Sequence, residues 1–106
     1  MTGEEIFKGK IETRLNENVD KVKAINAVYA FELTGDNNET WVIDLTKDSG
    51  FVSQGPADNA NCTVTIATSD LVDIIEKKLN PQMAFMTGKL KVKGDMGLAL
   101  NLGSIL

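Results

Sequence analysis

A chain of 106 residues with 42% hydrophobic and 25% charged residues has the composition of one globular domain. Its formal net charge of −4 argues against a nucleic-acid partner, because phosphate binding requires a basic excess on one face. Histidine is absent and Cys62 is the single cysteine, which excludes a His-based triad, a Cys–His pair, a typical zinc site and an internal disulfide.

The sequence also predicts no membrane span and no secretory leader. No apolar run reaches the ~18 residues that a spanning helix needs, and the first ten residues lack the basic and apolar regions of a signal peptide. A lone cysteine favours a reducing compartment. These features together indicate a binding function more than a catalytic one.

Residues 4–23 predict one amphipathic helix, because apolar residues recur there at spacings of three or four. Thr2 is the expected N-cap, and Glu4 and Glu5 lie in the first turn, where negative charge suits the helix dipole. The apolar stripe of this helix is Phe7, Ile11, Leu15, Val19 and Val22.

Four strands are predicted next, and three of them alternate apolar and polar residues with period two, which is typical of strands with one buried face; residues 51–54 are a short strand between two turns. Turn-forming residues separate them, and the turn at 35–38 predicts a hairpin between the first two. The predicted strands are residues 25–34, 40–45, 51–54 and 61–67.

The remaining elements are mostly helical. A helix is expected from Thr68 or Ser69 to Leu79, with Lys77 and Lys78 in its last turn. Asn80 followed by Pro81 starts the next helix, which Gly88 ends. A strand at 89–93 and a final helix at 96–106 complete the chain.

The predicted order is therefore α-β-β-β-β-α-α-β-α in a single domain, residues 1–106, without linker or repeat. Strands grouped before helices indicate an α+β fold. We expect a five-stranded, mostly antiparallel sheet that helices cover on one face.

No pair of carboxylates points to acid–base catalysis. Each close pair falls at a helix start or in a turn, where capping and solubility explain it. Cys62 alternates with Val64 and Ile66, which predicts a buried small hydrophobe and not a nucleophile. The closest carboxylate pairs are Glu4/Glu5, Asp70/Asp73 and Asp36/Asp48.

Two groups of lysines have alternative interpretations. Lys89, Lys91 and Lys93 fit the solvated face of an edge strand, or a surface that draws the protein to anionic lipid. Lys21 and Lys23 fit ordinary solvent-exposed charges, or a contact to a ligand carboxylate at a pocket rim.

An excess of apolar residues marks the last quarter of the chain. A helix that is apolar on every side must be buried or must face something apolar, and so small a domain has little to cover it. An ordinary core, a cavity for an apolar ligand and a hydrophobic protein contact all fit this pattern. The residues are Met83, Phe85, Met86, Met96, Leu98, Leu100, Leu102, Ile105 and Leu106.

This stretch resembles the signature of the sterol carrier protein type 2 domain. The resemblance extends upstream to 41–45 and 60–65, which look like the family's second and fourth strands, and it covers about residues 5–102. The loop at 54–57 looks like the family's modules fused to peroxisomal enzymes. The matching pattern is Asn80-Pro81-Gln82-x-Ala84-Phe85-x-x-Gly88-Lys89-Leu90-Lys91-x-x-Gly94-x-Met96-Gly97-Leu98-Ala99.

The resemblance implies a hydrophobic tunnel between sheet and helices that binds fatty acids, fatty acyl-CoA or sterols and transfers them without chemistry or cofactor. Lys23 is the candidate head-group contact. The expected ligand-binding residues are Phe85, Met96, Leu98, Leu100 and Leu102 by match to the family, together with Met86, and Ile11, Leu15, Phe31, Trp41, Ile66 and Ile75 as walls by periodicity.

Burying a 16-carbon chain is worth on the order of 12 kcal/mol before costs, whereas no polar partner for a sterol hydroxyl is evident. Fatty acids or acyl-CoA are therefore the first choice. Two positions depart from the family pattern: Ser104-Ile105-Leu106 lacks the central basic residue of a peroxisomal signal, and Leu100-Asn101 stands where many relatives carry a lysine. A cytoplasmic or a peroxisomal location is expected.

Two alternatives stay open. The chain could be a lipid-presenting module related to a multidomain peroxisomal β-oxidation or hydroxysteroid-dehydrogenase-like enzyme. It could instead be a protein-interaction domain that uses its apolar C-terminal helix. A monomer is expected, with a ligand-linked dimer as the other arrangement.

Overall fold

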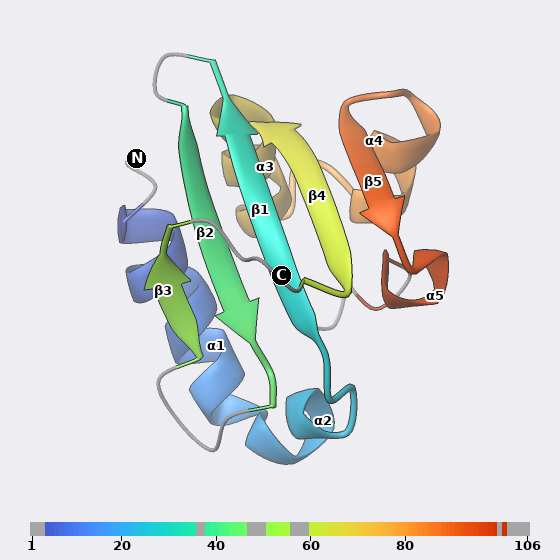
Figure 1. Cartoon of the computed structure of the whole chain (residues 1–106). Helices are drawn as coiled ribbons and strands as arrows, with labels where there is room; N and C mark the ends of the chain where they lie inside the picture. Colours follow the sequence, from blue (N-terminus) through green and yellow to red (C-terminus); the bar gives the residue numbers. More distant parts are fainter. Residues whose placement is uncertain (1–3, 36–37, 47–50, 56–59, 100, 102–106) are drawn as a thin grey trace.

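A computed structural model describes residues 4–35, 38–46, 51–55, 60–99 and 101. Figure 1 shows the chain coloured along its sequence. In chain order the elements are η1 (Glu5–Ile11), α1 (Glu12–Glu17), α2 (Val19–Lys23), β1 (Val28–Thr34), β2 (Glu39–Asp44), β3 (Val52–Gln54), β4 (Cys62–Ala67), α3 (Thr68–Ile75), α4 (Pro81–Met86), β5 (Leu90–Gly94) and α5 (Met96–Ala99).

The five strands form one sheet, as predicted, and their order is β3-β2-β1-β4-β5 (Figure 1). β2 pairs antiparallel with β1 and β3, and β5 pairs antiparallel with β4. β1 and β4, however, are parallel, with Phe31 opposite Val64. The sheet is mostly antiparallel as predicted, but it is mixed, because the chain crosses from the β3 edge to pair β4 with the far side of β1.

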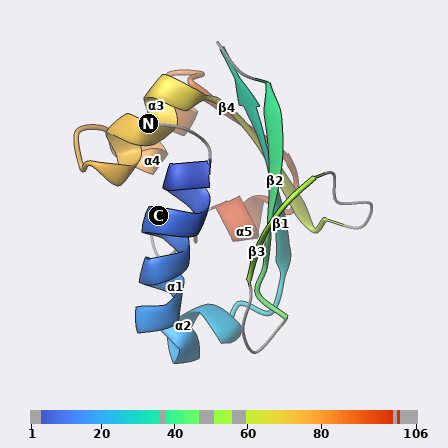
Figure 2. The ribbon, with the colours of Figure 1, turned by 90° about the vertical axis from the view of Figure 1, so that its left-hand side faces the viewer.

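The helices cover one face of the sheet. Seen edge-on in Figure 2, η1, α1, α3 and α4 lie on the same side of the strands. Tyr29 and Phe31 of β1 point toward this layer and are fully buried, whereas Glu32 between Phe31 and Leu33 is exposed. The period-two alternation of the strands therefore separates the covered face from the open one.

The N-terminal segment departs from the prediction of one regular helix. It winds as the π-helix η1, continues as α1, breaks at Asn18 with φ −127° and ψ 38°, and resumes as α2. The Asn18 side chain donates to the Arg14 carbonyl at 3.0 Å, competing with the regular backbone ladder. The wider π-turn brings both Ile6 and Phe7 into the core. The predicted cap, Thr2, lies outside the described residues.

β1 begins at Val28, three residues later than predicted. Asn26 adopts a left-handed conformation with φ 50°, which asparagine tolerates and an extended strand does not. The Val28 amide then donates to the Asn61 side-chain oxygen at 2.9 Å, so the start of β1 is tied to the start of β4. The other strand boundaries agree with the prediction to about one residue.

The second half of the chain follows the predicted order with two corrections. α3 ends at Ile75, earlier than expected, and Lys77 has φ 67°, so Lys77 and Lys78 follow the helix. The Thr68 hydroxyl donates to the Thr34 carbonyl at 3.3 Å instead of capping α3. α5 is described only to Ala99, and most of the helix predicted for 96–106 lies outside the described residues.

The start of α4 confirms its sequence signals. Asn80 accepts a hydrogen bond from the Gln82 amide at 2.8 Å, as an N-cap does, and Pro81 is the first helical residue. Gly88 has φ 81°, which fits the left-handed residue that commonly follows a helix.

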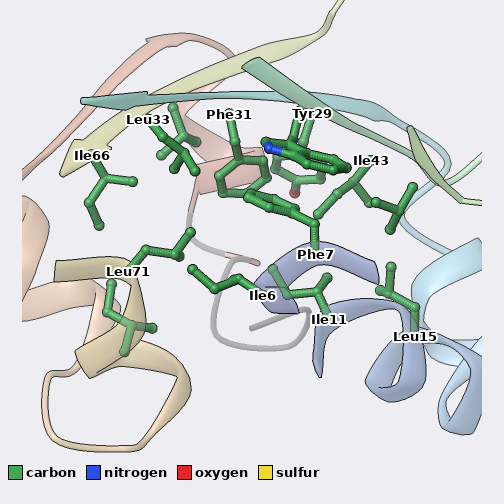
Figure 3. Packing of buried hydrophobic residues seen from close by; sticks show 14 of the residues in the cluster. Ile6, Phe7, Ile11, Leu15, Tyr29, Phe31, Leu33, Ile43, Ile66 and Leu71 are labelled. Atoms are coloured by element: carbon green, nitrogen blue, oxygen red, sulfur yellow. The ribbon is translucent and has the colours of Figure 1, made fainter. Parts of the chain in front are cut away.

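One apolar cluster joins the sheet to the helical layer (Figure 3). Phe7 from η1 stacks on Trp41 of β2 with a centroid distance of 5.3 Å, and meets Phe31 of β1 edge-on at 5.4 Å. Both geometries are favourable for aromatic pairs. Phe7 therefore fixes the N-terminal helical segment against β1 and β2.

Candidate functional site

The predicted wall residues lie together in the interface between sheet and helices. Side chains from η1, α1, β1, β2 and β4 meet in the cluster of Figure 3, and the five predicted residues among them are each at most 1% exposed. Ile75 of α3 is partly buried and packs against the same cluster. The buried members are Ile11, Leu15, Phe31, Trp41 and Ile66.

A pocket of about 240 Å³ opens beside this interface, between the N-terminal helical segment and α3. It contains two of the predicted residues, Ile11 and Ile75, on its apolar side. Its volume is below the roughly 300–1,000 Å³ of sites that hold whole small ligands. The pocket can accommodate only part of a long-chain lipid, and the described residues do not show a tunnel. The lining residues are Lys10, Ile11, Thr13, Arg14, Glu17 and Ile75.

The charges at the pocket were not among the sequence-based site residues. Lys10 and Arg14 are four residues apart, so they share one face of the helix, and with Glu17 they give the lining a net charge of +1. Their spacing next to Ile11 was the signal that could have identified them. Lys23, the predicted head-group contact, is exposed at the end of α2 and does not line this pocket.

The predicted C-terminal site residues are placed differently. Phe85 is 41% exposed, Met86 72% and Met96 49%, and Met83 is also half-exposed. Ala84 is the buried residue of α4. We call Met83, Phe85, Met86 and Met96 the α4–α5 patch. Leu98 is partly buried against the core cluster, while Leu100 and Leu102 lie outside the described residues.

Tyr29 is a buried polar group that the predicted site omitted. Its hydroxyl donates to the Leu98 carbonyl at 2.6 Å and so joins β1 to α5. Burial raises the pKa of Tyr29 well above its ordinary value, with smaller contributions from Cys62 and Asp95. A buried tyrosine needs a hydrogen-bond partner, but the residues around Tyr29 do not indicate that this partner lies 69 residues further along the chain.

Cys62 is fully buried opposite Tyr29, as the alternation predicts. Burial, and secondarily Asp95, raises the pKa of the Cys62 thiol. A protonated, inaccessible thiol is a poor nucleophile. Within the described ranges, no three His, Cys, Asp or Glu side chains gather as a metal site would require.

No helix formed by residues 4–35, 38–46, 51–55, 60–99 and 101 combines the length and apolar character that crossing a bilayer demands.

The fold defines the class first: an α+β domain built around an apolar interface between one mixed sheet and one helical layer. The model of the SCP-2 sterol transfer family matches residues 9–106, and the chain belongs to this family. The match confirms the resemblance carried by the segment from Asn80 to Ala99.

The chain is similar to parts of longer proteins. It is 47% identical over 88 residues to hydroxysteroid dehydrogenase-like protein 2 of Pongo abelii, which covers 82% of this chain and 21% of that protein. It is 41% identical over 104 residues to sterol carrier protein 2 of Oryctolagus cuniculus, with coverages of 94% and 19%. The chain spans about a fifth of the length of these curated relatives.

Two solved structures have the same fold. The sterol carrier protein domain 2 of Helicoverpa armigera superposes with a TM-score of 0.76 at 33% identity, covering 96% of this chain and 87% of that one. The palmitated SCP2L2 of Aedes aegypti superposes with a TM-score of 0.66 at 27% identity, with coverages of 91% and 93%.

Proposed function

We propose that this chain is a lipid carrier that binds fatty acids, fatty acyl-CoA or sterols between its sheet and its helical layer and transfers them without chemical change. The observation that carries the proposal is membership of the SCP-2 sterol transfer family over nearly the whole chain. The palmitated relative, 27% identical, supports fatty acids as one ligand class.

The pocket supports a position for the ligand. An acyl chain would enter past Ile11 and Ile75 and lie among the apolar wall residues, while its carboxylate would remain near Lys10 and Arg14. The gross gain of on the order of 12 kcal/mol from burying such a chain leaves micromolar affinity after ordering costs. The cationic rim favours fatty acid or acyl-CoA over a sterol, which has no charge to match it.

The wall residues are tightly packed, so the ligand must displace side chains that fill the interface. Ile11, Leu15 and Phe31 are each at most 1% exposed. Separation of the N-terminal helical segment from the sheet would open the path without breaking strand pairing, because η1, α1 and α2 are not part of the sheet that the described strands form.

Displacement of a fluorescent fatty acid tests the proposal. We expect unlabelled palmitate to compete at micromolar concentration, and oleoyl-CoA to compete as well. The chain is not a lipid carrier if no fatty acid, acyl-CoA or sterol binds below about 100 μM (about −5.5 kcal/mol) while circular dichroism shows the protein folded.

A second candidate follows from the coverage of the relatives. The similarity to hydroxysteroid dehydrogenase-like protein 2 involves about a fifth of that protein, so the same domain could present lipid to an attached enzyme. A carrier accelerates lipid transfer between donor and acceptor vesicles. A presenting module binds lipid with the same affinity but leaves the transfer rate unchanged.

The interaction-domain alternative predicts self-association or a protein partner at the apolar C-terminal region. Sedimentation equilibrium distinguishes this alternative from a carrier. A carrier remains monomeric without ligand, whereas a mass that rises with concentration supports the interaction domain.

We expect an intracellular location, cytoplasmic or peroxisomal. Microscopy of an N-terminally tagged chain that ends in Ser104-Ile105-Leu106 would separate these two compartments.

A further inference from the structure

We propose that the edge of the molecule formed by α4, β5 and α5 is a docking surface for anionic lipid bilayers. The proposal extends the carrier function, since a carrier must exchange its ligand with a membrane, but docking itself is measured without a ligand. Two independent properties of this edge, its charge and its exposed apolar side chains, lead to the same partner.

The charge is segregated along the chain. Residues 77–94 hold five lysines and neither aspartate nor glutamate. Because the whole chain has a net charge of −4, the other residues together carry −9. Lys78 lies 3.2 Å from the Glu76 carboxylate at the start of the segment. Lys89, just before β5, and Lys91 and Lys93 within β5 are exposed.

The apolar side chains belong to the same part of the chain. In the part that the structure describes, the exposed large hydrophobic residues are the four of the α4–α5 patch. Three of them precede the lysines of β5 and Met96 follows. Methionine suits a fluid apolar partner because its flexible side chain adapts its shape. Exposed large apolar side chains gathered in one region commonly mark a contact surface.

The fold brings these groups to one edge. β5 is the last strand of the sheet, and α4 and α5 both contact it. Figure 1 shows β5 on the edge opposite β3, with α4 beside its start and α5 just beyond its end. Leu90 is buried toward the core, so the lysines on either side of it project from the other face of the strand. Long lysine side chains can reach head groups while the patch enters the interface.

Charge complementarity selects the partner. An anionic bilayer attracts this edge and repels the acidic remainder, so the electric field orients the molecule with the patch toward the membrane. Each lysine close to such a surface strengthens binding by about fivefold. The apolar patch alone would also suit a second copy of the chain, but like charges on the two lysine-bearing edges would then face each other.

The test is flotation of ligand-free protein with vesicles of phosphatidylcholine, with and without phosphatidylserine. We expect binding only to the anionic vesicles, and loss of binding near 1 M salt, where the Debye length falls to about 3 Å. Binding to neither vesicle overturns the docking surface. The carrier function is unaffected by that result if fatty acid displacement persists.

Matched variants locate the surface. Lys91→Gln with Lys93→Gln should weaken vesicle binding by about 25-fold. The control Lys8→Gln with Lys21→Gln removes the same two charges from exposed positions on the N-terminal helical segment, and should change binding by less than about threefold. Equal losses in the two pairs would contradict the proposal, because only the net charge would then matter.

Met86→Ser tests whether the α4–α5 patch contributes to vesicle binding. This side chain is 72% exposed, so the fold should tolerate the change. We expect the variant to bind anionic vesicles more weakly than the unmodified protein does at the same salt concentration. Unchanged vesicle binding would exclude insertion of the patch. A concentration-dependent mass of the unmodified protein that Met86→Ser abolishes would assign the patch to a second copy and overturn the proposal.

Discussion

At the scale of single residues, Tyr29 shows how one polar atom connects distant parts of this domain. It is fully buried in an otherwise apolar cluster, and its hydroxyl is satisfied by the Leu98 carbonyl of α5. Removing the hydroxyl leaves that carbonyl without this donor. A buried, satisfied hydroxyl therefore holds the start of the C-terminal segment against β1.

Tyr29→Phe should lower the free energy of unfolding by about 1 kcal/mol, the net value of a typical hydrogen bond.

The pH dependence of the free energy of unfolding gives a second measure of what the Tyr29 hydroxyl contributes. Because the pKa of Tyr29 is raised in the folded state, its stabilising contribution is complete below pH ~10 and is lost as the pH rises above that value. Urea denaturation at neutral and alkaline pH measures both effects.

When the pH is raised from neutral to ~11, the free energy of unfolding should fall less for Tyr29→Phe than for the unmodified protein. Cys62, whose pKa is also raised, contributes in the same direction from about pH 8.5 upward and is present in both proteins. Identical alkaline loss in the two proteins would show that Tyr29 does not remain protonated in the fold.

Lys10 offers the residue-scale test of ligand orientation. It lines the pocket beside Ile11, so Lys10→Gln should weaken palmitate binding by about tenfold, as expected for losing a charge-assisted contact. Binding of methyl palmitate, which has no charge, should not change. Lys8→Gln is the matched control, since Lys8 is exposed and does not line the pocket. Equal loss for acid and ester would place the carboxylate elsewhere.

At the scale of elements, the junction between β4, β5 and α5 depends on glycine. Gly94 has φ 101°, and a Cβ there would lie 2.5 Å from the Asn61 carbonyl oxygen. The Asp95 amide donates to that same oxygen at 3.1 Å, so the backbone cannot move away without losing this bond. The close approach explains why glycine ends β5 and lets the chain turn into α5.

We expect Gly94→Ala to destabilise the fold by more than about 3 kcal/mol, because left-handed strain and a backbone clash add. Gly88→Ala is the control: its φ is 81° but nothing lies within 4 Å of the added Cβ. It should cost only about 1–2 kcal/mol. Thermal unfolding of both variants compares them, and equal destabilisation would mean that the contact with Asn61 is unimportant.

At the scale of the whole molecule, the helical layer and the sheet share one apolar interface, and Phe7 is central to it. The same interface is where the ligand is proposed to lie. The domain must therefore be stable when its interior is filled by its own side chains and must admit a lipid when the layers separate. Phe7 contacts β1 through Phe31 and β2 through Trp41.

Phe7→Ala should lower the free energy of unfolding by roughly 3–5 kcal/mol, as large-to-small changes in a packed core do. Met86→Ala, at a mostly exposed position, should change it by less than about 0.5 kcal/mol. Chemical denaturation of both proteins measures this difference. A small effect of Phe7→Ala would show that the layers are held together elsewhere.

Local patterns in the sequence were enough to determine much of this protein. The strands and their buried faces follow from period-two alternation, and α4 follows from Asn80, Pro81 and Gly88, because these signals act over a few residues. The family could be identified from the fixed positions of one segment. The concentration of lysines in residues 77–94 is likewise a property of the sequence alone.

Only the tertiary structure decided which of the apolar residues are inside. α4 and α5 are short, and their own sequences do not show which side the sheet will cover. The structure places Leu15 and Phe31 in the core but leaves Phe85 and Met86 exposed. The parallel pairing of β1 with β4 and the bond from Tyr29 to Leu98 also depend on residues far apart in the chain. Such long-range contacts follow from the packing of all elements together, which no local pattern contains.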